Sequence, residues 1–290
     1  MSALAKWLAA DRMRRVVFIA GLFPLLFFGV FSAAAVVMTA RLHGARNAII
    51  ECAGALVLVA GIGWILDMNL PVLLVSAVLS WTLLLGLGEI VRRTQSLTLA
   101  VQLSTVLALA GLLAASLAIG DPVAYWVPVL EGIYKELAET GVVMEVAIEQ
   151  QAQLMNGLLL ASALLSATLA LVLGNAMANQ TLGDAAQASR TEFRSLRLGF
   201  VIGVLAALAG LVELLGLSTG GALLIFGVAF MYQGMAVVAW WATGQRIPAG
   251  WMIGLCILLV FLPGALVAAL MLFATLGFTD NWYSLRRKAP

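Results

Sequence analysis

The chain has few charges, one histidine and two cysteines, and each shortage excludes a class of protein. Charged residues make up 10% of the 290 residues and hydrophobic residues 63%. A soluble domain is typically about 25% charged and about 45–50% apolar, so this chain must bury much of its surface in lipid. Cys52 and Cys256 lie inside apolar runs, which is typical of small core side chains and not of a disulfide framework. His43 alone cannot form a structural zinc site.

Chemical motifs are also scarce. The net charge of +2 is too small to indicate a nucleic-acid partner, which needs a concentrated basic patch. The sequence has no Gly-rich phosphate loop and no G-x-S-x-G elbow. Intramembrane catalysis needs a convergent nucleophile, base or metal set, and the apolar runs contain no paired acids. We therefore expect no enzyme activity, no metal and no cofactor.

Long apolar runs dominate what is present. A run of about 18 or more apolar residues can span a bilayer as a helix. Eight runs qualify, at 16–40, 48–66, 70–90, 97–119, 154–177, 198–217, 221–243 and 250–278. The first is too long for the 7–15-residue core of a signal peptide, so we interpret it as retained. The sequence predicts an all-α, polytopic membrane bundle of six to eight segments in one domain, residues 1–290.

Local signals mark several helix starts and two segments outside the bilayer. Asn69 precedes Pro71, and Asp121 precedes Pro122, where the acid or amide can cap a helix and proline can open it. Apolar residues recur at helical spacing over 122–151, which predicts an amphipathic helix on the membrane surface or over the bundle. A second, basic helix is predicted over 184–197.

The distribution of Lys and Arg predicts the orientation, because cytoplasmic loops are enriched in these residues. The loop arginines between the central runs should face the cytoplasm, and the acidic 122–151 helix, with Lys135 as its only cation, should be extracytoplasmic. If all eight runs crossed, both termini would emerge outside with their seven cations. If the first and last runs do not cross, fifteen of the sixteen cations lie inside.

Both terminal runs contain helix breakers, Gly21 and Pro24 in the first and Pro263-Gly264 in the last. Broken or re-entrant segments are tolerated where protein satisfies the backbone. We therefore favour six full spans, two broken terminal segments and cytoplasmic termini; a kinked single span is the alternative for each terminal run.

Four polar residues within the runs are candidates to face a ligand: Glu213, Tyr232, Gln233 and Gln102. Polar side chains in a membrane interior are costly and are often functional. For Tyr232 and Gln233 the alternative is helix packing, since a buried amide must find a partner. For Glu213 the alternative is exposure at the membrane interface.

Two basic clusters are candidates for contact with lipid headgroups or for docking a cytoplasmic partner. They are Arg190, Arg194 and Arg197, at helical spacing, and Arg286, Arg287 and Lys288. Basic residues beside a membrane segment commonly contact anionic headgroups. In the C-terminal stretch we expect Asp280 or Asn281 to end the last helix.

Three stretches resemble a known family as a set: "TEFRSLRLGF" at 191–200, "FMYQGMAVV" at 230–238 and "LGFTDNWYSLRRK" at 276–288. Their order and spacing are similar to the YybS-like family of bacterial membrane proteins (domain of unknown function 2232). That family distantly resembles the substrate-binding S components of energy-coupling-factor transporters. The resemblance implies six spans in a bacterial inner membrane and a role in small-molecule binding or transport with a membrane coupling partner. The alternative is a non-transporting scaffold that binds protein partners through 122–151 and 184–197.

Overall fold

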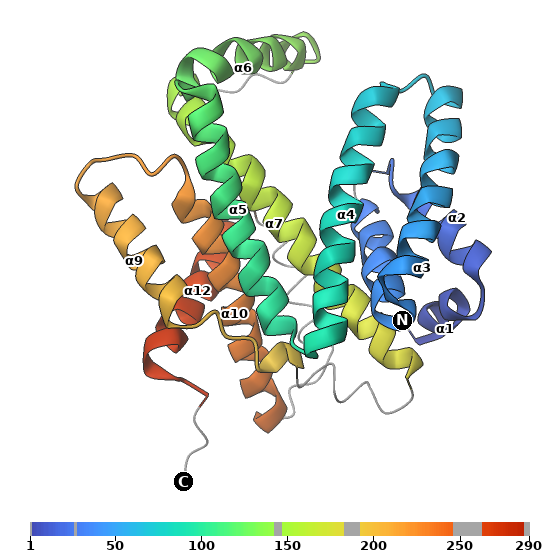
Figure 1. Cartoon of the computed structure of the whole chain (residues 1–290). Helices are drawn as coiled ribbons and strands as arrows, with labels where there is room; N and C mark the ends of the chain where they lie inside the picture. Colours follow the sequence, from blue (N-terminus) through green and yellow to red (C-terminus); the bar gives the residue numbers. More distant parts are fainter. Residues whose placement is uncertain (1, 26–27, 142–146, 183–191, 246–262, 287–290) are drawn as a thin grey trace. The chain divides into compact units, whose positions relative to one another are not determined.

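The structure is a computed structural model that describes residues 2–25, 28–141, 147–182, 192–245 and 263–286. These residues are mostly helical and contain no strand. Figure 1 shows the helices, which are α1 (Ser2–Ala10), α2 (Arg12–Leu22), α3 (Gly29–Ile65), α4 (Leu70–Thr94), α5 (Leu97–Ile119), α6 (Pro122–Glu139), α7 (Ile148–Thr181), α9 (Phe200–Leu214), α10 (Ala222–Gln245) and α12 (Pro263–Tyr283). The all-α class predicted from the sequence is confirmed.

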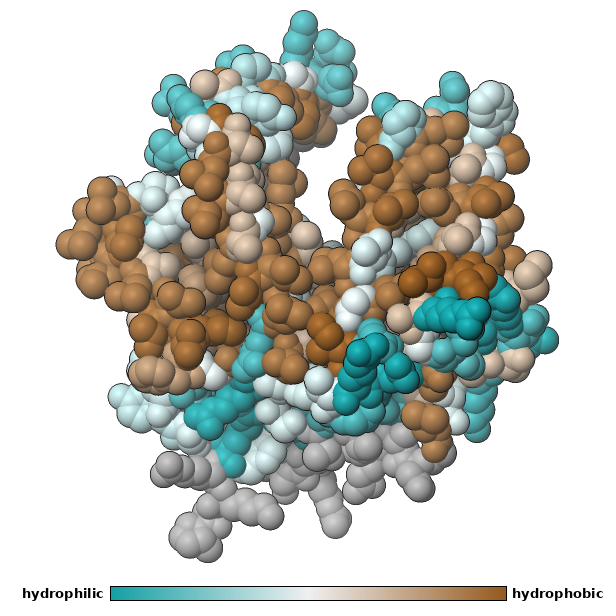
Figure 2. Space-filling view, viewed as in Figure 1, coloured by the Kyte–Doolittle hydropathy of each residue, from teal (hydrophilic) through white to brown (hydrophobic). Residues whose placement is uncertain are grey.

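Five of these helices are long and apolar enough to cross a membrane: α3, α4, α5, α7 and the Ala222–Ala242 part of α10. α9 is apolar but shorter. Its outward side chains are strongly exposed, with Val201 70% and Leu214 87% accessible, and Figure 2 shows an apolar surface over this helix. Large apolar side chains are left uncovered in this way where lipid replaces water. The helices therefore indicate a membrane protein in contact with lipid.

The predicted caps at two helix starts are confirmed. Asn69 accepts a hydrogen bond from the Val72 N–H at 3.3 Å, and α4 begins at the next residue. Asp121 accepts from the Val123 N–H at 2.9 Å, and α6 begins at Pro122. Each side chain satisfies a backbone donor that has no partner within the first turn of its helix.

The chain forms two compact units, which are described separately. Unit 1 comprises Met1–Ser104 and Ser166–Leu196, and unit 2 comprises Thr105–Leu165 and Arg197–Pro290. Helices α5 and α7 are each divided between the two units. The single domain predicted over 1–290 stays a prediction.

In unit 1 the first apolar run folds back on itself. α2 ends at Leu22 and α3 begins at Gly29, so the run is broken close to Pro24, as predicted. The Ser32 hydroxyl donates to the Ile19 carbonyl at 2.7 Å, which places the two halves side by side. With 11 residues, α2 is about 16 Å long, about half of a hydrocarbon core of roughly 30 Å. The described helical parts of the run, residues 16–22 and 29–40, therefore form the two arms of a helical hairpin whose two ends lie at the same end of unit 1.

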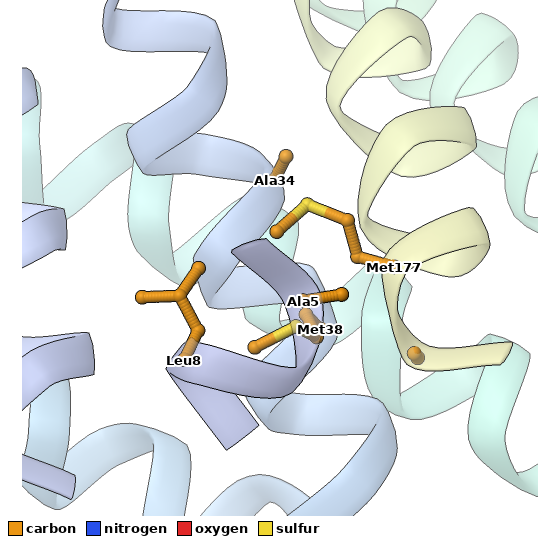
Figure 3. Close-up of a cluster of buried hydrophobic side chains, with 6 residues drawn as sticks. Ala5, Leu8, Ala34, Met38 and Met177 are labelled. Atoms are coloured by element: carbon orange, nitrogen blue, oxygen red, sulfur yellow. The ribbon is translucent and has the colours of Figure 1, made fainter. Parts of the chain in front are cut away.

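The N-terminal helix packs at that end of the hairpin. Ala5 and Leu8 of α1 are fully buried against Ala34 and Met38 of α3, together with Met177 of α7; Figure 3 shows these side chains meeting. Residues 34–41 of α3 are buried on every side, and all of them except Thr39 and Arg41 are apolar. α3 then kinks at Gly44, whose φ of 81° and ψ of 167° are accessible almost only to glycine.

In unit 2, α10 and α12 are antiparallel and unusually close. A Cβ added to Gly234 would collide with the carbonyl oxygen of Phe273, and one added to Gly277 would collide with that of Phe230. Glycines at these positions let the two backbones touch, as small residues do between membrane helices. α6 is tied to the start of α7 by a 2.8 Å hydrogen bond from the Trp126 indole to Asn156.

The structure differs from the sequence prediction in the two segments outside the apolar runs. The 122–151 segment is not one helix, because α6 ends at Glu139, Gly141 has a φ of 88°, and α7 begins at Ile148. In the 184–197 segment, residues 183–191 lie outside the described residues, and a helical turn ends at Arg194. Residues 196–199 are not helical. Gly199, just before α9, has a φ of 85° and a ψ of 166°, a conformation nearly restricted to glycine.

Candidate functional site

A connected set of polar groups lies in unit 2, where the segment before α9 meets α10 and the end of α12. We call it the polar network. It comprises the backbone of Leu198 and Gly199 and the side chains of Arg197, Gln233, Asp280, Asn281 and Arg286. The residues of the polar network come from all three sequence stretches that carry the family resemblance.

Gln233 lies at the centre of the network and is fully buried. Its side-chain oxygen accepts from the Leu198 N–H at 2.8 Å, and its amide nitrogen donates to Asp280 Oδ2 at 3.0 Å. An amide placed in an apolar helix is costly unless both its ends are paired. Gln233 meets that requirement with one bond to a loop and one to a neighbouring helix.

Asp280 is a buried carboxylate, 1% exposed, in the last turn of α12. Arg286 donates to Asp280 Oδ2 at 2.6 Å from a guanidinium nitrogen and to Oδ1 at 3.4 Å from Nε. This bidentate pairing satisfies both carboxylate oxygens and balances the charge. α12 continues past Asp280 to Tyr283. The prediction that Asp280 or Asn281 ends the last helix was therefore wrong. Their side chains instead bond to Gln233 and Gly199.

Asn281 and Arg197 attach the segment before α9 to α12. Asn281 donates to the Gly199 carbonyl at 2.8 Å and accepts from the Gly199 N–H at 3.1 Å. Arg197 donates to the carbonyls of Asp280 and Asn281, both at 3.2 Å, and to the Ser284 hydroxyl at 2.7 Å. A cation over the final carbonyls of a helix also interacts favourably with its dipole. Three helices are therefore joined at one point.

The four predicted ligand-facing residues have different surroundings. Tyr232 is 4% exposed and donates to the Leu165 carbonyl at 2.7 Å. Glu213 accepts from the N–H and hydroxyl of Thr219, at 2.9 and 2.5 Å, in the connection after α9. Gln102 is partly buried on α5. Tyr232 and Gln233 are sequence neighbours on α10, and Gln102 belongs to the other unit. The role of the four residues toward a ligand stays a prediction.

The residues of the two predicted basic clusters have different outcomes. Arg197 and Arg286 belong to the polar network, and Arg194 is partly buried at the end of a helical turn. Arg190, Arg287 and Lys288 lie outside the described residues. The intramolecular bonds of Arg197 and Arg286 were missed. Arg197 bonds residues more than eighty positions away, which sequence spacing does not identify. Arg286 pairs with Asp280, six residues earlier, and the interpretation of the C-terminal cations as a lipid or docking contact left this pairing out.

Unit 1 holds two further buried arginines that the sequence did not single out. Arg15 makes a bidentate pair with Glu51, at 2.8 and 2.6 Å, and both side chains are nearly inaccessible. Arg41 donates to the Asn175 side chain and lies 3.4 Å from Glu192. Arg15 falls at the polar edge of an apolar run, and only the fold shows that it points inward.

Two described cavities lie in unit 1 and none of the four predicted ligand-facing residues lines either. The one between α3 and α4 has a volume of about 180 Å³, with Cys52, Trp81 and Thr82 among aliphatic side chains. Among the described residues no group of three His, Cys, Asp or Glu side chains could hold a metal ion.

Comparison of the chain with protein-family models, with curated proteins and with solved structures found no match. The fold itself defines the class, a helical membrane protein. Within it, the polar network joins three buried polar side chains, Gln233, Asp280 and Asn281, to Arg197 and Arg286.

Proposed function

We propose that the chain is a YybS-like protein of the bacterial inner membrane that serves as an S-component-like small-molecule binding or transport component, and is not an enzyme. The observation that carries the proposal is the polar network. The resemblance rests on three stretches that are far apart in the sequence, and the network takes Arg197, Gln233 and Asp280, one from each, into a single set of hydrogen bonds. This supports treating the three stretches as one structural feature.

The hairpin of residues 16–40 supports the topology that belongs to this proposal. The Arg41 end of that hairpin lies at the same end of unit 1 as α1. If residues 16–40 do not cross the membrane, the chain crosses it once less than the eight runs imply. The N-terminus then lies on the same side as the arginines in the loops between the central runs. We propose that this side is cytoplasmic. The C-terminus belongs there too if the final run does not cross, and residues 250–262 of that run lie outside the described residues.

The proposed ligand contacts are Tyr232 and Gln233, with Gln102 and Glu213 as further candidates. Transporter sites near mid-membrane use few polar groups, and Tyr232 and Gln233 are adjacent polar residues in the interior of an apolar helix. Both are bonded to protein atoms. A ligand at this position would have to take over at least one of those bonds, which predicts that binding and the packing of α10 are coupled.

The test is purification in mild detergent from the native membrane, with mass spectrometry of small molecules and proteins in the same sample. The proposal expects a stoichiometric small molecule, which Tyr232→Phe should reduce while the protein still elutes as a single species. Ser162→Ala is a matched control, since its exposed hydroxyl bonds only within its own helix. A sample without any retained small molecule would contradict the proposal.

A scaffold that binds protein partners is the second candidate, and α6 favours it. Tyr125, Val129 and Ile133 form a stripe along this helix and are 54%, 44% and 46% exposed. Leu130, on the adjoining face, is 3% exposed, so the apolar arc of the helix is wider than the part that is packed. Replacing the three stripe residues with serine should abolish recovery of a protein partner if this candidate is correct, and should leave a bound small molecule in place.

A further inference from the structure

Helices α1 and α2 present a surface that combines cations with exposed apolar side chains. Lys6, Arg12 and Arg14 are exposed. Beside them, Trp7 is 46% and Met13 67% exposed. Arg14 lies 5.3 Å from the Trp7 ring centre and 3.8 Å from Asp11, a largely exposed pair. These residues, with Leu4, form what we call the N-terminal surface, whose three cations outnumber its single acid.

This surface is held in place from beneath. The inner side of α1 is buried in the core shown in Figure 3. Arg15 donates to the carbonyls of Leu8 and Ala9, at 3.1 and 3.2 Å, and so fastens the end of α1, while Glu51 neutralises its charge. The outward residues are therefore carried by a fixed framework, and Arg15 is already committed to interior contacts.

The position of α2 sets the height of the surface relative to the bilayer. Val16, Ile19 and Ala20 belong to the apolar hairpin and are buried against α3, and Val17 is 57% exposed, as a side chain facing lipid would be. The hydrocarbon boundary therefore falls close to residue 16. Arg12 lies four residues earlier, about 6 Å along the helix, and the polar headgroup layer is about 5–8 Å deep on each side.

We propose that the N-terminal surface binds the phosphate groups of anionic phospholipids. Lys6, Arg12 and Arg14 contact headgroups, and Trp7 and Met13 insert into the boundary between headgroups and acyl chains. The combination of a basic face with an exposed tryptophan is what holds interfacial helices to anionic membranes. Hydrophilic residues gather over α1 in Figure 2. A soluble acidic protein would not need the apolar side chains, and a zwitterionic lipid would not need the excess of cations. This inference does not depend on the transport proposal.

The experiment is a lipid titration of the purified full-length chain in mild detergent. Bound phosphatidylglycerol and phosphatidylcholine with identical acyl chains are counted by native mass spectrometry. A cation near an anionic surface contributes about fivefold to binding. Since Asp11 is present in both chains, the variant Lys6→Gln/Arg12→Gln/Arg14→Gln loses three such contributions and should bind phosphatidylglycerol about 100-fold more weakly. Its affinity for phosphatidylcholine should not change.

Two controls keep the result interpretable. Arg12→Lys/Arg14→Lys retains the charges and should bind within about threefold of the native chain, since lysine contacts phosphate as a point charge. The variant Arg46→Gln/Arg93→Gln/Lys135→Gln removes three charges outside the surface and should also retain binding. Native affinity in the triple N-terminal variant would overturn the proposal. An equal loss for both lipids, or an equal loss in the variant lacking the other three charges, would overturn it as well.

Discussion

Replacing Asp280 with alanine should destabilise unit 2 by about 3 kcal/mol. The substitution removes two hydrogen bonds from Arg286, whose side chain is only 12% exposed, and it leaves the buried Gln233 amide without its acceptor at 3.0 Å. Losing hydrogen bonds to a charged group costs about 1.5–3 kcal/mol, and a buried unsatisfied donor costs about 1–3 kcal/mol. Water that reaches Arg286 offsets part of the sum, which leaves about 3 kcal/mol.

The assay is reversible unfolding by dodecyl sulfate in mixed micelles, followed by circular dichroism. Asp280→Asn is the matched variant, because its one amide oxygen can still accept from Gln233 and from Arg286 at the position of Oδ2. It loses the charge and the acceptor of the longer bond from Arg286 Nε, and it should cost about 1 kcal/mol. Glu139→Ala, at the exposed end of α6, should change stability by less than about 0.5 kcal/mol. A cost below about 0.5 kcal/mol for Asp280→Ala, or a greater cost for Asp280→Asn, would refute the reasoning.

The remaining predictions concern packing, a buried ion pair and backbone conformation. Gly277→Ala should cost about 1–3 kcal/mol in the same assay, because its methyl group would meet the Phe230 carbonyl and force α10 and α12 apart; an unchanged midpoint would show that the helices are not in contact. Glu51→Gln should cost about 3 kcal/mol, because the buried Arg15 loses its counter-charge, and limited proteolysis should then cut near α1 sooner; native proteolysis would contradict the role of the pair. Gly44→Ala should cost about 1–3 kcal/mol through its φ of 81°, measured against Gly61→Ala, an open helical position where the effect should be neutral or stabilising.

Sequence reasoning was reliable for features governed by one physical requirement. Lipid must be met by apolar side chains over the length of a helix, so hydropathy located α4 and α5 to within a few residues. Helix caps are equally local. Asn69 and Asp121 accept hydrogen bonds from backbone N–H groups two or three residues away, so the residue type is enough to predict the contact.

Sequence reasoning failed where a side chain has a choice of partner. The spacing of Arg190, Arg194 and Arg197 fits a helical face, but Arg197 lies in a non-helical segment and bonds α12. Nothing near Gln233 in the sequence indicates that Leu198 and Asp280 would satisfy it. The prediction that 122–151 forms one helix was wrong because Gly141, with a left-handed φ, follows the early end of α6. The spacing of apolar residues does not indicate the backbone angle of a single glycine.

The sequence by itself determined that this protein is helical, that several of its helices can cross a membrane, and where some of them begin. Those properties depend on residue type and on neighbours within one helical turn. Tertiary structure alone decided that Arg15 is buried with Glu51, and that three distant stretches form one polar network. In each case the free energy comes from contacts between segments far apart in the chain, and a single polar side chain in an apolar run takes whichever partner the fold brings within reach.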